Sequence, residues 1–310
     1  MRPFHFIPDN TNIRFMRYAR VGIIASIVAC VMSIGLFIAF GLNLGIDFKG
    51  GTLIEIQTKQ NADISALRKK IGSLGLGGFE LQEFGTPKDV LIRIETQKGG
   101  EKAQQGAILK IKESLGNDVT YRRVEVVGPK VSGELARESM IAVIVSILAV
   151  MIYIWFRFEW QFSIGAVLSL SHDVLLTIGI FAILQLEFSL PIIAAILTIV
   201  GYSLNDTVVV YDRVRENMRK YKKKDLSDII EMSLNQMLRR TIMTSVSTLL
   251  ALGALYVFGG EVLRGFTFTM MWGVVVGTYS SIFIAAPLLI RLGARVSDPV
   301  QTDDAIGENA

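Results

Sequence analysis

The chain has 310 residues, of which 51% are hydrophobic and 19% are charged, and its mean hydropathy of +0.46 is typical of a membrane protein. The net charge of +4 does not require a nucleic-acid partner, because short loops between membrane spans carry an excess of Lys and Arg. The single cysteine, Cys30, excludes a disulfide framework and a cysteine-based metal site, and two histidines cannot form a His cluster. We therefore expect no metal and no other cofactor.

Six apolar runs are long enough to cross a membrane as helices. The first, 21–44, follows a polar segment and is too long for the apolar region of a signal peptide, so we expect an uncleaved span; a signal anchor would give the same topology. The other five are predicted at 140–156, 162–184, 190–211, 241–258 and 266–292. Each has about 17 residues or more, enough for the hydrocarbon core, where only helices satisfy the backbone at such lengths.

Basic residues predict the orientation of these spans. The segment 212–240 contains nine Lys and Arg residues, and the turn 185–189 contains none. By the positive-inside rule, both termini and the segment 212–240 are cytoplasmic. The predicted organisation is a cytoplasmic N-terminus, a first transmembrane helix, a periplasmic domain, a five-helix transmembrane bundle with one cytoplasmic loop, and a cytoplasmic tail that is disordered after Ser297. These parts occupy, respectively, 1–20, 21–44, 45–135, 136–295 with the loop at 212–240, and 296–310.

The segment between the first two runs has the composition of a soluble domain. Alternating apolar residues predict strands at 52–58, 79–84, 90–96 and 119–127. Helical spacing predicts helices at 63–74 and 101–115, with Asp63 as a cap of the first. The order β-α-β-β-α-β indicates a ferredoxin-like domain. The fold class predicted from the sequence is therefore a polytopic α-helical membrane protein with a small α+β domain between helices 1 and 2.

A carboxylate lies inside the fourth apolar run, where Asn205 and Asp206 interrupt it. Such a group costs a few kcal/mol on insertion scales, so it usually faces a partner or a water-filled path. Arg240 opens the next span at the same membrane surface, and its long side chain can reach into the bundle. A carboxylate beside a guanidinium stays ionised, and one alone in a dry site binds a proton. This pair predicts a proton relay; the alternative is a static ion pair.

Three spans carry polar residues on one helical face, and we expect these faces to converge. The alternative for any single Ser or Thr is a bond to its own helix backbone. Asp173, in the third span, is a candidate second relay station. Its neighbour His172 points to a different side of the helix, by about 100°, and is expected to be a packing histidine with its hydrogen bonds satisfied and not a relay. The three sets are Ser169, Asp173 and Thr177; Thr198, Tyr202, Asn205 and Asp206; and Thr241, Thr244, Ser245 and Thr248.

Motifs for ATP hydrolysis and for common membrane hydrolases are absent from the sequence: it contains no G-x-x-x-x-G-K-[ST], H-E-x-x-H or G-x-S-x-G. We therefore do not expect an enzyme. The energy source would be an ion gradient or the membrane potential, which supplies about 2.3 kcal/mol per charge per 100 mV. Gly273 and Gly277 form a G-x-x-x-G motif, which predicts close approach of another helix.

Five stretches resemble the SecF family, which belongs to the resistance-nodulation-division superfamily. They are GIDFKGGTLI at 45–54, SHD at 171–173, VGYSLNDTVVVYDRVREN at 200–217, RT at 240–241 and FGGE at 258–261. The resemblance implies a multi-pass subunit of the bacterial inner membrane that uses the proton-motive force in late steps of protein export. It also implies a SecD partner, association with the SecYEG channel and YajC, and contact with the translocating polypeptide. Because the chain ends after six spans, it resembles the separate SecF form and not a SecD–SecF fusion.

The resemblance also implies roles for individual residues. Asp206 and Arg240 match the family's membrane aspartate and essential arginine. The family signature at the foot of the external domain corresponds to Asp47, Phe48, Lys49, Gly50 and Gly51, whose glycines would permit a tight turn. In the resulting hypothesis, protonation of Asp206 releases Arg240, the helices re-pack, and the external domain swings to hold or release an emerging polypeptide. The alternatives are a transporter of a small hydrophobic or lipid-like molecule, and a scaffold.

Overall fold

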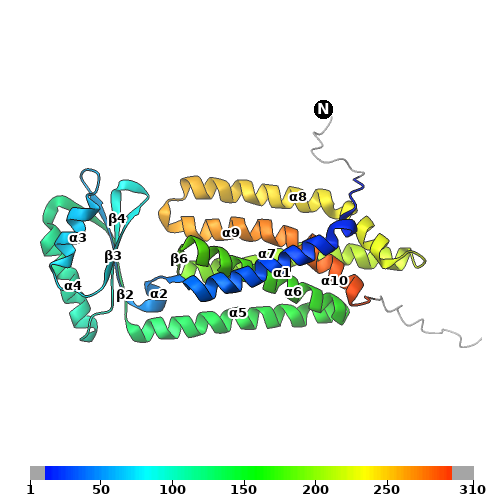
Figure 1. Ribbon diagram of the computed structural model, residues 1–310, viewed down its shortest axis with the longest axis horizontal. Helices are drawn as coiled ribbons and strands as arrows, with labels where there is room; N and C mark the ends of the chain where they lie inside the picture. Colours follow the sequence, from blue (N-terminus) through cyan, green and yellow to red (C-terminus); the bar gives the residue numbers. More distant parts are fainter. Residues whose placement is uncertain (1–10, 295–310) are drawn as a thin grey trace, which may run out of the picture.

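The computed structural model describes residues 11–294 and consists of a small α/β domain at one end of a bundle of long helices (Figure 1). The first ten residues of the predicted N-terminal segment and the predicted tail at 296–310 lie outside the described residues. Helix α1 enters the bundle at the end far from the domain, and α10 ends there as well (Figure 1). The turn Tyr221–Asp225 between α7 and α8 also lies at this end.

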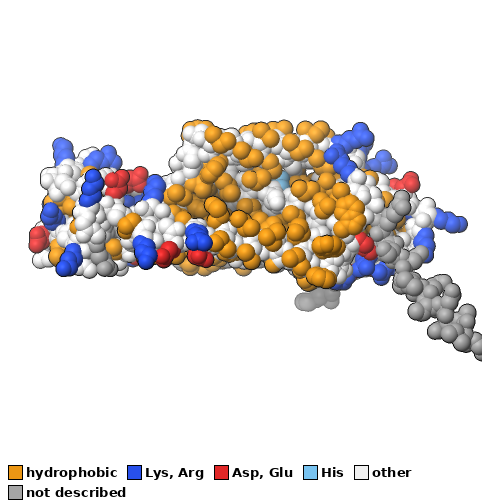
Figure 2. All heavy atoms as spheres, turned by 90° about the horizontal axis from the view of Figure 1, so that it is seen from below, with side chains coloured by type: hydrophobic (Ala, Val, Ile, Leu, Met, Phe, Trp, Pro, Cys, Tyr) orange, Lys and Arg blue, Asp and Glu red, His pale blue; other side chains and the backbone are white. Residues whose placement is uncertain are grey.

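Six helices in the described part of the chain are long and apolar enough to cross a membrane, which confirms the predicted number. They surround an apolar core that has one large cluster in the half away from the domain and smaller clusters in the half near it. Figure 2 shows a broad apolar band over the outside of the bundle, with charged side chains gathered toward its ends. The sixth helix is interrupted by a π-helical turn, η2. The bundle helices are α1 (Phe15–Phe40), α5 (Pro129–Arg157), α6 (Trp160–Leu184), α7 (Leu190–Lys220), α8 (Leu226–Phe258), and α9 (Glu261–Ser280) continued by η2 (Ser281–Ala285) and α10 (Ala286–Arg291).

Several helices are longer than the apolar runs from which they were predicted. The segment expected as a loop at 212–240 is mostly helical, because α7 continues to Lys220 and α8 already begins at Leu226. The polar first turns of α8 remain helical because one face still buries apolar side chains against the bundle, among them Ile230 and Leu234. Hydropathy marks where a helix can cross the membrane and does not mark where the helix ends.

The α/β domain has the predicted order of elements. Its four antiparallel strands lie in the order β3-β4-β2-β5, which is the ferredoxin-like arrangement. The predicted cap of α3 is present, because Oδ1 of Asp63 accepts a hydrogen bond from the Ala66 N–H at 2.9 Å. The elements are β2 (Gly51–Thr58), α3 (Ile64–Gly72), β3 (Phe79–Phe84), β4 (Thr86–Ile94), α4 (Gly100–Leu115), η1 (Gly116–Asp118) and β5 (Val119–Val127).

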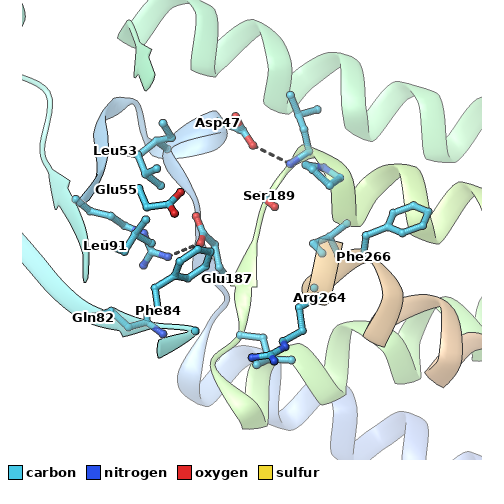
Figure 3. Close-up of a pocket in the computed structure, with 18 of the residues that line it drawn as sticks. Asp47, Leu53, Glu55, Gln82, Phe84, Leu91, Glu187, Ser189, Arg264 and Phe266 are labelled. Carbon is cyan, nitrogen blue, oxygen red and sulfur yellow. Dashed lines mark hydrogen bonds and ion pairs between the residues drawn. The ribbon is translucent and has the colours of Figure 1, made fainter. Parts of the chain in front are cut away.

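The two faces of the sheet have different roles. Helices α3 and α4 cover the face that points away from the bundle, where Ile54, Ile92 and Ile111 are fully buried (Figure 1). The other face carries Leu53, Leu91 and several charged side chains and is turned toward the bundle. A cavity of about 670 Å³ separates this second face from the ends of α7 and α9 (Figure 3).

A compact connection links the domain to the bundle. Strand β1 (Asn43–Leu44) follows α1 and pairs in parallel with β6 (Glu187–Phe188), which directly precedes α7. A single helical turn, α2 (Ile46–Lys49), then leads into β2. The chain therefore passes from α1 into the domain along the end of α7, although these segments lie far apart in the sequence.

Candidate functional site

The first polar site lies between α7 and α8 around Asp206. Its Oδ1 accepts a hydrogen bond of 2.9 Å from the hydroxyl of Thr241, a buried residue of α8. Its Oδ2 is also buried but accepts no hydrogen bond from the part of the chain that the structure describes. A buried carboxylate oxygen without a donor is costly, so this arrangement leaves room for a proton or for a donor from another molecule.

The other predicted members of this site, Arg240 and Asn205, are both exposed. The charge of the Arg240 guanidinium acts on Asp206. The two side chains do not form an ion pair within 4.0 Å in residues 11–294, so Thr241 makes the direct contact that the sequence assigned to Arg240. In the described residues Asp206 therefore contacts Thr241 directly, and Arg240 lies beyond ion-pair distance.

The remaining polar residues of α7 and α8 divide into two groups. Tyr202 donates to Thr248 at 3.1 Å and Ser245 contacts Thr278 of α9 at 2.8 Å, so these residues join helices. Thr198 and Thr244 instead donate to carbonyl oxygens of their own helices. The alternative of local backbone bonding thus holds for some of the predicted stripe and not for the rest.

A second polar site lies on another face of α7 and is sealed. Asp173 of α6 is 1% exposed, and its Oδ2 accepts hydrogen bonds from Ser203 of α7 at 2.6 Å and from Ser280 of α9 at 2.9 Å. Its Oδ1 lies 3.0 Å from Nδ1 of His172. Each carboxylate oxygen therefore has at least one partner, and the group joins three helices.

The three predicted stripes do not meet at one point, because α7 presents two polar faces. Asp206 and Tyr202 face α8, whereas Ser203 and Thr207 face α6 and the sixth helix. Thr207 lies 2.9 Å from Ser281, the first residue of the π-helical turn. Such turns widen a helix locally and are frequent at functional sites.

Sequence reasoning missed Ser203, Ser280 and the position of His172. His172 is buried, as a packing histidine would be, but its ring is not turned away from Asp173: the Cα–Cβ directions of adjacent helical residues diverge by about 100°, and the imidazole turns back toward its neighbour. Its Nε2 is buried without a hydrogen bond from the described residues. The two serines carried a usable signal, because each is a hydroxyl within an apolar run.

The G-x-x-x-G motif lies where α9 crosses α7. A Cβ at Gly273 would lie 2.3 Å from side-chain atoms of Ile199, and one at Gly277 would lie 2.9 Å from Cβ of Ser203. The absence of side chains at both glycines therefore allows α9 to approach the sealed face of α7, in agreement with the predicted close packing.

The signature residues lie in the connection between the domain and the bundle. Asp47 is the second residue of the single turn of α2, and its Oδ2 accepts a hydrogen bond of 2.8 Å from the Leu190 N–H at the start of α7 (Figure 3). Phe48 packs on Phe188, with ring centroids 6.0 Å apart. Gly50 and Gly51 both have positive φ, as a tight turn requires.

Comparison with protein families gives two matches. Residues 107–295 match the model described as "Protein export membrane protein SecD/SecF, C-terminal", and residues 35–62 match the "SecD/SecF GG Motif". The chain belongs to the SecD/SecF family. Asp173, Asp206 and Arg240 lie in the first matched segment, and the signature from Asp47 to Gly51 lies in the second.

Individual members of the SecD/SecF family extend this result. The chain is 43% identical to the protein translocase subunit SecF of Cereibacter sphaeroides, over 96% of this chain and 95% of that one. It is 44% identical to the protein translocase subunit SecDF of Brucella abortus, over 97% of this chain but only 40% of the relative. The chain thus spans almost all of the former relative and less than half of the latter.

Solved structures of the SecD/SecF family agree with the fold. The crystal structure of SecDF from Thermus thermophilus matches with a TM-score of 0.84 at 34% identity, and covers 94% of this chain and 40% of that one. A SecDF structure described as a super-membrane-facing form matches at the same identity and coverage with a TM-score of 0.70. The chain is therefore a multi-pass membrane protein of a family of transport components, with a fold that also forms part of a larger SecDF chain.

Proposed function

We propose that this chain is the SecF subunit of the bacterial Sec export machinery and that, with SecD, it couples the proton-motive force to late steps of protein translocation. The chain covers 95% of each of two relatives that are protein translocase subunits SecF, which supports the export role. The observation that carries the coupling is the carboxylate of Asp206, with a buried Oδ2 that lacks a donor and a guanidinium nearby.

In this proposal Asp206 binds and releases a proton, and Arg240 responds to the change in charge. Loss of the negative charge removes the attraction between Asp206 and Arg240. It also weakens the hydrogen bond from Thr241, because the acceptor is no longer an anion. Both effects alter the contact between α7 and α8. Asp173 has a structural role in this proposal, since its three side-chain partners fix the carboxylate where α6, α7 and α9 meet.

The exposed polar residues beside Asp206 support SecD as the partner. Asn205 and Arg240 lie on the outside of this six-helix bundle, within or next to apolar runs. An amide and a guanidinium exposed to hydrocarbon are costly, so another protein surface is expected to cover them. The SecDF relatives contain a further part of more than half their length, which supports a homologous bundle as that cover. The SecYEG channel and YajC complete the proposed assembly.

The proposed orientation puts both termini and the turn Tyr221–Asp225 in the cytoplasm and the α/β domain in the periplasm of the inner membrane. The basic residues at the end of α7, including Arg219 and Lys220, support this orientation. The domain would then act on polypeptides after they cross the membrane. No chemical step on the substrate is part of the proposal.

Inner-membrane vesicles containing the complex would test the coupling. The late steps of export of a secretory protein are timed with a proton gradient, after the gradient is removed by a protonophore, and in vesicles that lack this chain. We expect the gradient to accelerate export only when the chain is present. Equal acceleration without the chain would contradict the proposal.

The alternative of a small-molecule transporter has its own outcome in these vesicles. The transporter alternative would be favoured if a hydrophobic dye accumulated in a way that depends on this chain and on the gradient, without any effect on export. The external domain argues against a small-molecule pump, which would be expected to have two large external domains, because the described residues form a single small α/β domain. A scaffold role would be supported if charge-neutral changes at Asp206 left gradient-driven export intact.

A further inference from the structure

The outer end of α7 is capped by a residue from a distant part of the chain. Ser189 occupies the N-cap position, but its side chain makes no capping hydrogen bond. Oδ2 of Asp47 instead accepts the Leu190 N–H at 2.8 Å, across a separation of 143 residues (Figure 3). A carboxylate at this end also interacts favourably with the helix dipole. The signature aspartate therefore completes the helix that carries Asp206.

Three further contacts surround this cap. Arg93 of β4 forms an ion pair with Glu187, which lies directly before α7 (Figure 3). The Gly45 N–H donates to the Phe188 carbonyl oxygen at 2.9 Å, which extends the pairing of β1 with β6. The ring of Phe48 packs on that of Phe188. The domain and α7 are thus joined by backbone, ionic and apolar contacts within a few residues.

The turn from α2 into the sheet is closely packed, so its backbone has little room to move. A Cβ at Gly51 would lie 2.4 Å from the carbonyl oxygen of Ile94 in β4, and one at Gly50 would lie 2.8 Å from Oγ1 of Thr96. Both glycines have positive φ, at +126° and +73°, so the chain turns sharply against the sheet. The signature therefore forms a close-packed connection and does not act as a flexible linker.

We propose that the signature is a rigid joint and that Asp47 is a positioning residue, which transmits displacement between the external domain and α7. This inference rests on the proposed function. Asp206 lies on the same uninterrupted helix, sixteen residues beyond Leu190, or about 24 Å at 1.5 Å per residue. A movement of α7 that follows proton binding at Asp206 would therefore reach the domain through Asp47 and the Arg93–Glu187 pair.

A thiol probe in the cavity tests this transmission. Gln82 is exposed on β3 and lines the cavity between the sheet and the bundle (Figure 3). In vesicles containing the complex, the rate of thiol modification is measured for Q82C in a Cys30→Ser background, with Asp206 present and with Asp206→Asn. We expect the two rates to differ about fivefold or more, the lower range of couplings between distant sites. In Asp47→Ala the difference should disappear.

The matched control is Asp63→Ala, which also removes a helix-capping carboxylate but only within the domain. This variant should keep the difference in modification rate. A difference that survives in Asp47→Ala would overturn the inference and leave the proposed function intact. Equal rates with Asp206 and Asn at position 206, in the presence of Asp47, would reject transmission to the domain and the proposed coupling together.

A disulfide can replace the joint and separates transmission from folding. A Cβ placed on Gly45 would lie 3.4 Å from Cβ of Ser189, close to the separation found in disulfides. The variant Asp47→Ala with Gly45→Cys and Ser189→Cys, in the Cys30→Ser background, should lose gradient-driven export when reduced and regain it when oxidised. If the oxidised cysteine pair blocks export even with Asp47 present, the joint has to open during the cycle and the inference is wrong.

Discussion

Two carboxylates on neighbouring helices of the bundle, Asp173 and Asp206, differ in how completely their neighbours satisfy them. Asp173 is 1% exposed and has three side-chain partners from three helices. Asp206 is half-buried, has one hydroxyl donor, and keeps a buried oxygen without a donor from the described residues. Both residues are aspartates, so they differ in the number of hydrogen-bond partners and in the burial of the carboxylate.

This difference has a mechanical meaning. A carboxylate held by side chains from several helices fixes those helices relative to one another, because moving any one of them breaks a hydrogen bond. A carboxylate with one oxygen that accepts no hydrogen bond can take up a proton there without displacing a donor. The sealed side of α7 therefore suits a fixed packing surface against α6 and α9, and the side facing α8 suits movement. Helix α7 lies between the fixed and the variable contacts.

The largest expected effect comes from Asp206→Asn. The amide cannot bind and release a proton, so gradient-driven acceleration of export should be lost while the chain still assembles in the membrane. Export into vesicles with and without the gradient measures the loss, and co-purification with SecD measures assembly. Asp212→Asn is the control, because Asp212 lies on the same helix and its carboxylate is exposed and paired with Arg157. Full gradient response in Asp206→Asn would reject the relay.

The next effect is on stability, from Asp173→Asn. The new amide nitrogen replaces one carboxylate oxygen and cannot accept, so either His172 or the pair Ser203 and Ser280 loses its buried acceptor, at a cost of about 3 kcal/mol. Thermal unfolding of the purified complex in detergent would show the loss. Ser247→Ala should change little, because within residues 11–294 the Ser247 hydroxyl bonds only to its own helix. A lost gradient response at unchanged stability would instead make Asp173 a second relay station.

The sequence predicted the framework of this comparison but not its details. Six spans and the ferredoxin-like order followed from hydropathy and periodicity, which are local properties of the chain. Asp206 was found because a charge inside an apolar run is conspicuous. Ser203 and Ser280 were not, because the face that a helix turns toward its neighbours depends on tertiary packing.

The role of Asp47 could not be predicted for a different reason. Its partner is a backbone N–H 143 residues away, and a backbone group leaves no trace in the pattern of side chains. The pairing of Asp206 with Arg240 shows the converse limit. Opposite charges at matching depths indicated proximity, but the direct hydrogen bond goes to Thr241, whose hydroxyl was one of several on its face. Periodicity predicts which face of a helix is polar, but it does not predict which residue on that face makes a given contact.

Gly273→Ala tests whether the sealed side of α7 is a packing surface. The added methyl group would overlap Ile199, so α9 has to move away from α7, at a cost of about 1 to 3 kcal/mol. Thermal unfolding should detect this cost. Gly201→Ala is the matched control, since Gly201 is exposed on α7 and a Cβ there meets nothing within 4 Å. Equal stability of the two variants would show that the close approach of α9 is not required.

The smallest expected effect, and the most specific, comes from Thr241→Val. Valine keeps the shape of threonine but removes the only hydroxyl that donates to Asp206 within residues 11–294, a contribution of about 1 kcal/mol. A hydroxyl donor interacts differently with the two protonation states of a carboxylate, so the variant should keep gradient-driven export but displace its pH dependence. Export rates across a pH series at a constant gradient measure this displacement. Thr244→Val should leave the pH profile unchanged, because Thr244 donates only to carbonyl oxygens of α8. Identical profiles for Thr241→Val and the unaltered chain would mean that the titrating group does not sense this hydroxyl, and the moving charge would have to be sought away from Asp206.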